Sequence, residues 1–206
     1  MNSAELIEVI KAIGIRIEEE KDFLTMLDNI IGDGDHGINM ARGFHAVDEK
    51  LKGLEDRDIG TILRTVGMAL VSNVGGASGP LYGTALMKAG MAMADKTELD
   101  MQDFLSCMDE AISGVQARGK AQQGEKTMLD AMIPAQQAMR QAFSGGLDNR
   151  AVLAAGVKAA QEGVEYTKTI IATKGRASYL GERSIGYQDP GATSFTDILE
   201  VIAQSV

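Results

Sequence analysis

The stretch Glu5–Ile17 reads ELIEVIKAIGIRI, and its apolar residues recur every third or fourth position. This spacing places the aliphatic side chains on one face of a helix with 3.6 residues per turn. The same period recurs nearly everywhere downstream, and no run alternates apolar and polar residues as a half-buried strand does. The sequence therefore predicts an all-α protein.

Eight helices are expected from this period and from local start and stop signals. Asp58 is a plausible N-cap, Pro80 suits a first helical position, Gly119 ends a helix, and Pro134 is a possible kink. No internal repeat or linker interrupts the pattern, so residues 1–206 are expected to form a single domain. The expected helices cover about residues 6–32, 40–51, 59–70, 80–94, 104–119, 129–143, 150–173 and 190–202.

The composition excludes several classes of protein. The 206 residues carry a net charge of −9 with Lys and Arg scattered, which argues against a nucleic-acid or anionic-membrane partner. The single Cys107 excludes an internal disulfide and is expected to be a buried thiol. The chain shows no signal peptide and no apolar run long enough to span a bilayer. We expect a cytoplasmic protein.

The connections between the expected helices are of two kinds. Three are short and turn-like, at residues 53–57, 95–99 and 144–149. Four are rich in glycine, charge and hydroxyls, at residues 31–37, 75–80, 118–127 and 174–190. Short loops favour antiparallel neighbours, and antiparallel succession would place all four unusual connections at one end of the bundle. The sequence thus predicts a site at one rim.

Three carboxylates, Asp28, Asp33 and Asp35, fall within eight residues. Two carboxylates ~6 Å apart repel by roughly 3 kcal/mol at an effective dielectric of 20, unless a cation lies between them. Such hard oxygen ligands suit Mg²⁺ completed by phosphates and waters. The alternative is a set of solvated turn and cap aspartates, and the convergence of the glycine-rich loops favours the metal.

The segment Gly75–Pro80 leads directly into a helix, where small residues let backbone N–H groups approach an anion. His36 could be a phosphohistidine, but we expect it to orient a ligand or contact a nucleotide. His45 is expected to be exposed. Gly32, Gly34 and Gly37 match a dinucleotide fingerprint, but no strand precedes them.

Two other motif matches also fail. An EF-hand loop beginning at Asp33 would place Phe44 where a bidentate Glu is required. The run 124–127 resembles the end of a P-loop but lacks the Gly–Lys pair and the upstream strand.

Four segments together carry a family pattern: residues 32–39, 75–80, 118–128 and 174–192. They resemble the L subunit of dihydroxyacetone kinase, and the likeness runs essentially the full length. The resemblance implies a barrel of eight antiparallel up-down helices with the nucleotide at one rim. Gly34 and Tyr187 depart from close relatives without removing a ligand.

The resemblance also implies roles for individual residues. Asp28, Asp33 and Asp35 would hold two Mg²⁺ ions that bridge the phosphates of ADP or ATP. The implied nucleotide contacts come from all four loops: His36, Gly37, Ile38, Asn39, Ala77, Ser78, Gly119, Met128, Arg176, Asp189, Pro190 and Gly191.

In the bacterial three-subunit system that the chain resembles, ADP stays bound as a cofactor. It accepts a phosphoryl group from a phosphohistidine of the M subunit, and the ATP formed phosphorylates dihydroxyacetone held on the K subunit. Three alternatives stay open: a nucleotide-exchanging ATP-dependent kinase domain of the same superfamily, a fatty-acid-kinase-type nucleotide domain, and a non-catalytic ADP sensor that binds a transcription regulator.

The connection 174–190 is longer than the structureless connections usual in compact domains. Gly175, Gly181 and Gly186 are expected to act as pivots, and Tyr179 with Leu180 as an apolar anchor on the rim. We expect this segment to fold over the nucleotide.

Overall fold

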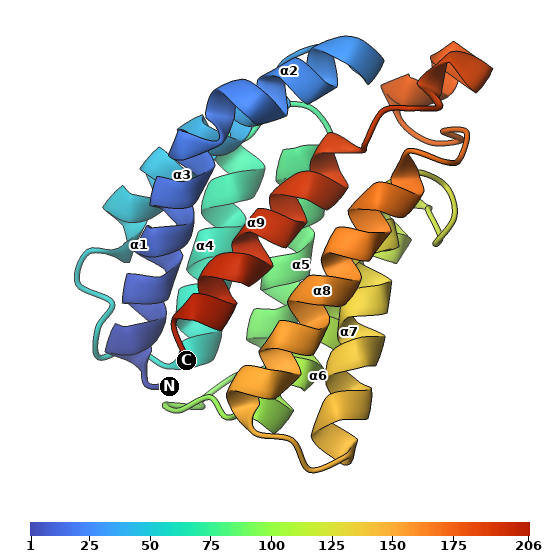
Figure 1. Ribbon diagram of the computed structural model, residues 1–206. Coiled ribbons are helices and arrows are strands. Elements are labelled where there is room, and N and C mark those ends of the chain that lie inside the picture. Colours follow the sequence, from blue (N-terminus) through green and yellow to red (C-terminus); the bar gives the residue numbers. More distant parts are fainter.

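The computed structural model describes all 206 residues and contains no β-strand, so the all-α prediction is confirmed (Figure 1). An isolated bridge pairs Asn2 with Glu98. None of the helices combines the length and the apolar character needed to cross a membrane. The elements are α1 Ser3–Glu19, α2 Lys21–Ile31, α3 His36–Leu51, α4 Ile59–Asn73, α5 Ser78–Ala92, α6 Met101–Gly119, α7 Leu129–Ser144, α8 Asn149–Thr167, the 3₁₀ helix η1 Arg176–Ser184, and α9 Pro190–Gln204.

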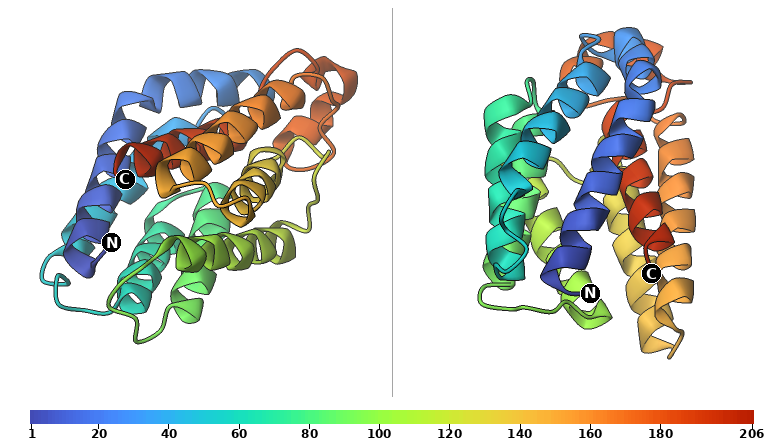
Figure 2. Two further views of the ribbon diagram at one scale, coloured as in Figure 1. Left: turned by 60° about the horizontal axis from the view of Figure 1, so that its bottom comes forward. Right: turned by 90° about the vertical axis from the view of Figure 1, so that its left-hand side faces the viewer.

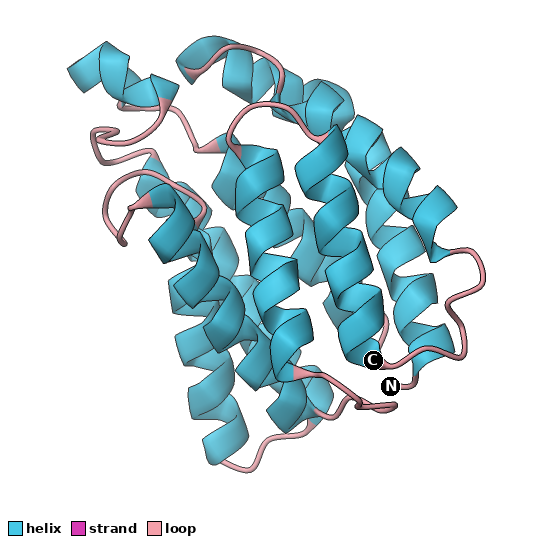
Figure 3. Cartoon of the chain, turned by 180° about the vertical axis from the view of Figure 1, so that it is seen from behind, coloured by secondary structure: helices cyan, strands magenta, loops and turns pink.

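From α3 onward successive α-helices run antiparallel, so their connections gather at the two ends of the molecule (Figure 3). The two termini and the short connections lie at one end (Figure 1). The connections α2–α3, α4–α5, α6–α7 and α8–α9 lie at the other end together with η1. The predicted convergence of the four unusual connections on one rim is therefore confirmed.

One cluster of 44 buried apolar residues receives side chains from all nine α-helices. The helices surround an interior cavity of about 530 Å³, which is lined mostly by apolar side chains and to which every α-helix except α2 contributes. Figure 2 shows the helices arranged around this interior. The expected buried position of Cys107 is confirmed, and the thiol lines the cavity.

The predicted first helix is in fact two, which brings the number of α-helices from the expected eight to nine. The chain bends at Glu20, which has φ −86° and ψ 0° (Figure 2). No glycine or proline stands there to signal a break. The Glu20 side chain lies 3.5 Å from Arg16, and the Glu20 N–H still donates to the Arg16 carbonyl oxygen.

Other predicted boundaries also shift. α5 begins at Ser78, so Pro80 is its third residue and not its first, a place where proline costs little because first-turn N–H groups have no helical partner. α8 ends at Thr167 rather than Thr173, because the next two N–H groups form tight-turn hydrogen bonds. Asp58 caps α4 as predicted, and α6 ends at Gly119 with the left-handed cap at Lys120.

Glycines let α4 and α5 approach until their backbones touch. A Cβ on Gly67 would lie 2.7 Å from the carbonyl oxygen of Gly83, and a Cβ on Gly83 would lie 2.7 Å from that of Gly67. Gly60 and Gly90 form a second reciprocal pair, at 2.5 and 2.7 Å. We call these four residues the glycine seam. It fixes the two helices that carry the second connection of the rim.

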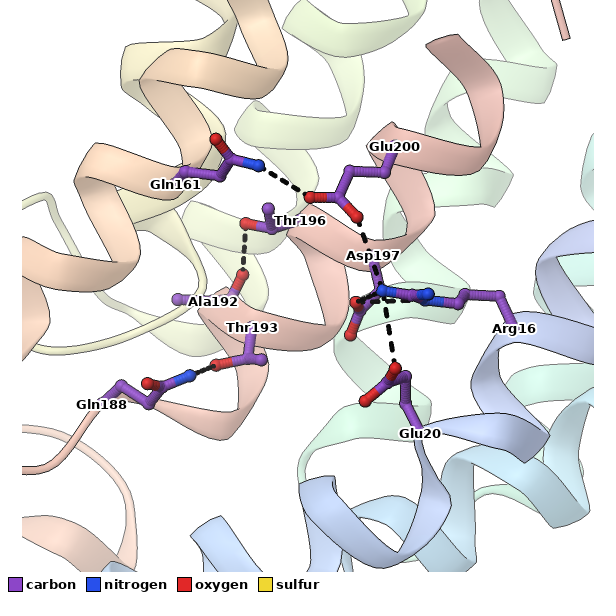
Figure 4. A network of polar contacts seen from close by, with 9 residues as sticks. All are labelled: Arg16, Glu20, Gln161, Gln188, Ala192, Thr193, Thr196, Asp197 and Glu200. Carbon is purple, nitrogen blue, oxygen red and sulfur yellow. Dashed lines mark hydrogen bonds and ion pairs between the residues drawn. The ribbon is translucent and has the colours of Figure 1, made fainter. Parts of the chain in front are cut away.

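α9 is tied to its neighbours by the polar network in Figure 4. Arg16 of α1 donates to Asp197 Oδ1 at 3.0 Å and lies 3.5 Å from Glu200. Gln161 of α8 donates to Glu200 at 2.8 Å. Burial raises the pKa of Asp197 to about 6, although the Arg16 guanidinium opposes the shift. These contacts fix α9, which brings its first turn to the rim.

Candidate functional site

The three predicted aspartates meet at the rim. Asp28 lies in α2, whereas Asp33 and Asp35 lie in the connection to α3. One carboxylate oxygen from each lies within 4.8 Å of the other two. Asp28 is buried, Asp35 is half-buried and Asp33 is exposed, so the cluster opens from the protein towards solvent. Three hard oxygen donors at this spacing fit a divalent cation such as Mg²⁺.

The Asp28 side chain also caps the start of α3. Its Oδ2 accepts hydrogen bonds from the backbone N–H groups of Asp35 at 2.9 Å and His36 at 3.1 Å. Asp35, the residue at the N-cap position, makes no such side-chain bond itself. A carboxylate at a helix N-terminus is favoured by the helix dipole. Asp28 therefore couples the acidic cluster to the start of α3.

The α8–α9 connection reaches this cluster through Arg176, at the start of η1. Its Nε lies 2.7 Å from Asp33 Oδ2. Gly175, Gly181 and Gly186 all have positive φ, with values of 60°, 56° and 92°, so the chain turns at each of them. The sequence predicted no helix or strand in this segment, whereas η1 occupies its centre. The prediction that Tyr179 anchors the segment to the rim is wrong, because Tyr179 is 85% exposed.

The α4–α5 connection packs against the start of α3. A Cβ on Gly75 would lie 2.9 Å from Asn39 Nδ2, so only glycine lets this loop come so close. Asn39 is 5% exposed, its Oδ1 accepts from Arg42 at 2.8 Å, and its Nδ2 has no hydrogen-bond partner. The N-cap of α5, Ala77, makes no side-chain bond to the first turn. An unpaired buried donor therefore lies beside an uncapped helix N-terminus, as in sites that bind anions.

His36 is buried at the centre of the rim and joins three helices. Its Nδ1 lies 2.8 Å from Ser78 Oγ in α5, and its Nε2 lies 2.9 Å from Ser194 Oγ in α9. Burial lowers the pKa of His36 to about 4, although the Asp28 carboxylate opposes the shift. His36 is therefore a neutral imidazole with both nitrogens engaged, which favours an orienting role over a phosphohistidine. His45 is exposed, as predicted.

The first turn of α9 lies against the α6–α7 connection. Asp189 caps α9 by accepting from Ala192 N at 2.7 Å. A Cβ on Gly191 would lie 3.5 Å from Met128 Cβ, so the first turn of α9 and the α6–α7 connection come together at two predicted site residues. Burial raises the pKa of Asp189 to about 7, and the Asp130 and Asp28 carboxylates add to this shift.

Two charged residues that organise this corner had no predicted role. Lys126 is 1% exposed, and its Nζ donates to the carbonyl oxygens of Thr167 and Tyr187. Burial lowers the pKa of Lys126, an effect that the Asp189 and Asp130 carboxylates oppose. Asp130, also fully buried, accepts from the N–H groups of Gly124 and Thr127. The Gly-Glu-Lys-Thr run belongs to the family pattern at residues 118–128, but the sequence predicted no role for its lysine, which joins the α6–α7 connection to the end of α8 and to the α8–α9 connection.

The remaining predicted contacts lie around the same rim with fewer links. Gly37 packs against α2, where a Cβ would meet the Lys21 carbonyl oxygen at 2.0 Å. Ile38 is 51% exposed, and Gly119 lies at the end of α6 against Leu81. Pro190 is buried as the first residue of α9.

Comparison with known proteins decides the family. Residues 30–204 match the model of the DAK2 domain. The chain belongs to the DAK2 domain family. Among its relatives in this family is the ADP-binding subunit of the PEP-dependent dihydroxyacetone kinase of Escherichia coli, which is 42% identical over 98% of this chain and 97% of its own length.

Longer proteins are similar too. The L-erythrulose 1-kinase of Mycolicibacterium smegmatis is 36% identical over 88% of this chain, which spans 32% of that protein. Among solved structures, the dihydroxyacetone kinase from C. freundii in complex with AMP-PNP and Mg²⁺ superposes with a TM-score of 0.75 and 22% identity. The match covers 97% of this chain and 33% of that one, so the two proteins share this fold over that part.

Proposed function

We propose that the chain is the ADP-binding subunit of a phosphoenolpyruvate-dependent dihydroxyacetone kinase. The observation that carries the proposal is the rim itself. It gathers three carboxylates within 4.8 Å, an uncapped helix N-terminus and the unpaired amide of Asn39. Cation ligands next to anion donors suit a metal–nucleotide complex better than either ligand alone. The name of the Escherichia coli relative points the same way.

Asp28, Asp33 and Asp35 would hold two magnesium ions. Their oxygens have the chemistry that Mg²⁺ prefers, and phosphates and waters would complete its coordination. When bound, magnesium would neutralise charge on the phosphate oxygens. Arg176, which pairs with Asp33, adds a positive charge at the same place.

The nucleotide would lie along the loops that meet here. Ala77 and Ser78 would present the first N–H groups of α5 to the phosphates, and Met128 with Gly191 would close the opposite side. The bound ADP would accept a phosphoryl group from a phosphohistidine of an M subunit and pass it, as ATP, to dihydroxyacetone on a K subunit. Such transfer needs positioning and charge neutralisation more than a protein nucleophile.

A second candidate function is a nucleotide-exchanging domain of an ATP-dependent kinase. The 36% identity to an L-erythrulose 1-kinase supports it, since that protein contains a domain of this kind within a longer chain. The two candidates differ in whether the nucleotide is retained through the reaction or exchanged after it.

Heat extraction of the purified chain separates these candidates, since retained ADP supports the subunit and its absence favours exchange. In an activity assay, the chain alone should form no dihydroxyacetone phosphate from ATP and dihydroxyacetone. It should support formation when K and M subunits and a phosphoenolpyruvate-driven phosphoryl donor are added. Turnover by the chain alone would contradict the proposal.

A further inference from the structure

Behind the rim, a buried row of hydroxyl and imidazole groups runs from α5 through α9 to α3 and back to α5. The Tyr82 hydroxyl lies 2.8 Å from Ser194 Oγ, and Ser194 Oγ lies 2.9 Å from His36 Nε2. His36 Nδ1 lies 2.8 Å from Ser78 Oγ. Tyr82 and Ser194 are 6% and 0% exposed, so the row is buried. The predicted nucleotide contacts include His36 and Ser78 but neither Tyr82 nor Ser194.

We infer that Tyr82 and Ser194 are positioning residues, which act through His36 to leave the Ser78 hydroxyl proton free for a bound phosphate. The inference rests on the proposed function for the identity of that phosphate, which is part of Mg-ADP. The direction of the hydrogen bonds follows from the distances within the protein.

Each hydroxyl has one proton, and the geometry selects where it goes. The Tyr82 proton can reach Ser194 Oγ at 2.8 Å or the Gly191 carbonyl oxygen at 3.4 Å. The Ser194 proton can reach His36 Nε2 at 2.9 Å, the same carbonyl oxygen at 3.2 Å or the Tyr82 hydroxyl oxygen at 2.8 Å. If Ser194 donated to Tyr82, the Tyr82 proton would be left with only the Gly191 carbonyl oxygen at 3.4 Å. Hydrogen bonds between two oxygens usually span about 2.5–3.0 Å, so both carbonyl contacts are too long to compete. Tyr82 therefore donates to Ser194, and Ser194 donates to His36 Nε2.

An imidazole whose Nε2 accepts a hydrogen bond has its ring proton on Nδ1. His36 then donates from Nδ1 to Ser78 Oγ, so the Ser78 proton has no partner inside the protein. Ser78 is half-buried at the rim and is the first residue of α5, where the N–H groups also point outward. The hydroxyl and these amides together form a set of donors for one phosphate.

The reverse order would disable this arrangement. If His36 kept its proton on Nε2, its Nδ1 would accept a hydrogen bond from the Ser78 hydroxyl. The phosphate would then meet only the lone pairs of that hydroxyl. A tautomer shift at His36 is therefore equivalent to losing one hydrogen bond to a charged ligand. Such a bond corresponds to roughly a tenfold change in affinity or more.

The test is ¹⁵N NMR of histidine-labelled protein, because the chain has only two histidines and His45→Gln assigns the signals. Ligand-free wild type should show His36 protonated on Nδ1. Ser194→Ala should shift the proton towards Nε2 and weaken calorimetric Mg-ADP affinity about tenfold, as Ser78→Ala should. Tyr82→Phe should shift the tautomer in the same direction by a smaller amount.

Thr196→Val is the matched control. It removes another buried α9 hydroxyl, one that donates to Ala192 O at 2.9 Å and does not touch His36 (Figure 4). It should leave both the tautomer and the affinity unchanged. An Nε2-protonated His36 in wild type, or an unchanged tautomer in Ser194→Ala, overturns the inference. Absence of Mg-ADP binding in wild type with the expected tautomers would instead contradict the proposed function alone.

Discussion

Asp28 has two roles that a substitution can separate. Its carboxylate belongs to the acidic cluster, and its Oδ2 also accepts two N–H groups at the start of α3. An asparagine keeps an acceptor oxygen but loses the charge. We therefore expect Asp28→Asn to leave the melting temperature nearly unchanged while abolishing magnesium-dependent ADP binding. Asp28→Ala should lose binding and also about 1 kcal/mol of stability, the usual value of a helix cap.

The measurements are thermal melting in the absence of ligand and calorimetry with ADP in the presence and absence of magnesium. Asp22→Asn, an exposed change on the same helix, is the control and should alter neither. Magnesium-dependent affinity that survives in Asp28→Asn would remove Asp28 from the metal site.

How far the site can be predicted from sequence depends on how local its contacts are. Asp28, Asp33 and Asp35 are close in sequence, so their clustering can be predicted from the sequence alone. The partners of His36 lie 42 and 158 residues away, and no periodicity reveals such pairs. Lys126 was missed for the same reason, because its two carbonyl partners are 41 and 61 residues distant.

At the scale of elements, a glycine of the seam and a glycine outside it are predicted to respond in opposite ways to alanine. In Gly67→Ala the new methyl group would meet the Gly83 carbonyl oxygen, which belongs to a backbone and cannot move aside. We expect a loss of roughly 1–3 kcal/mol, as for other overpacked sites. In Gly14→Ala the nearest atom is Phe44 Cβ at 3.5 Å, an ordinary contact. Because alanine favours the helix, Gly14→Ala should gain about 0.5–1 kcal/mol.

Urea unfolding of the two variants beside wild type measures both effects. Equal stabilities for wild type and Gly67→Ala would mean that α4 and α5 separate easily, contrary to the close approach at the seam.

The α8–α9 connection carries a second prediction at this scale. Arg176 joins it to the acidic cluster, whereas Arg183, on the same 3₁₀ helix, reaches only the Leu180 carbonyl oxygen at 3.4 Å. Mg-ADP should slow hydrogen exchange of residues 174–189, because a closed connection shields its amides. Arg176→Ala should weaken ADP retention, and Arg183→Ala should not. Identical exchange with and without nucleotide would leave the segment a plain connector.

Element boundaries show which signals a sequence carries. The cap at Asp58 is read correctly because it depends on residues three positions apart. The bend at Glu20 is missed because Arg16, which pairs with Glu20, is also held by Asp197 and Glu200 of α9. The overestimate of α8 has a similar origin, since the Thr167 carbonyl oxygen is taken by a distant lysine.

For the whole molecule, ligand binding should appear as stability. A ligand that binds only the folded state adds about 4 kcal/mol at a thousandfold excess over its Kd. For a chain of this size that corresponds to a rise of roughly 8–16 °C in melting temperature. We expect Mg-ADP to produce such a shift and EDTA to reverse it. A sample that contains ADP and melts unchanged after EDTA treatment would contradict magnesium as the bridge.

The overall architecture was the most predictable level. Antiparallel succession alone places alternate connections at the same end, so the rim follows from counting helices, even though one of them proved to be two. The Glu20 bend does not disturb the count, because α2 stays at the rim end where the expected single helix would have finished (Figure 1).

The glycine seam has a kinetic consequence for folding. Gly60 and Gly67 lie within α4, and Gly83 and Gly90 lie within α5. A glycine in the middle of a helix, as Gly67 and Gly83 are, costs roughly 0.5–1 kcal/mol relative to alanine, and isolated helices of this length are marginal in water, so neither helix is stable before it docks. Their backbones come together only when both are formed, and we infer that the pair is gained in one step. Substitutions on α4 and on α5 should then divide their effects between folding and unfolding rates in the same proportion.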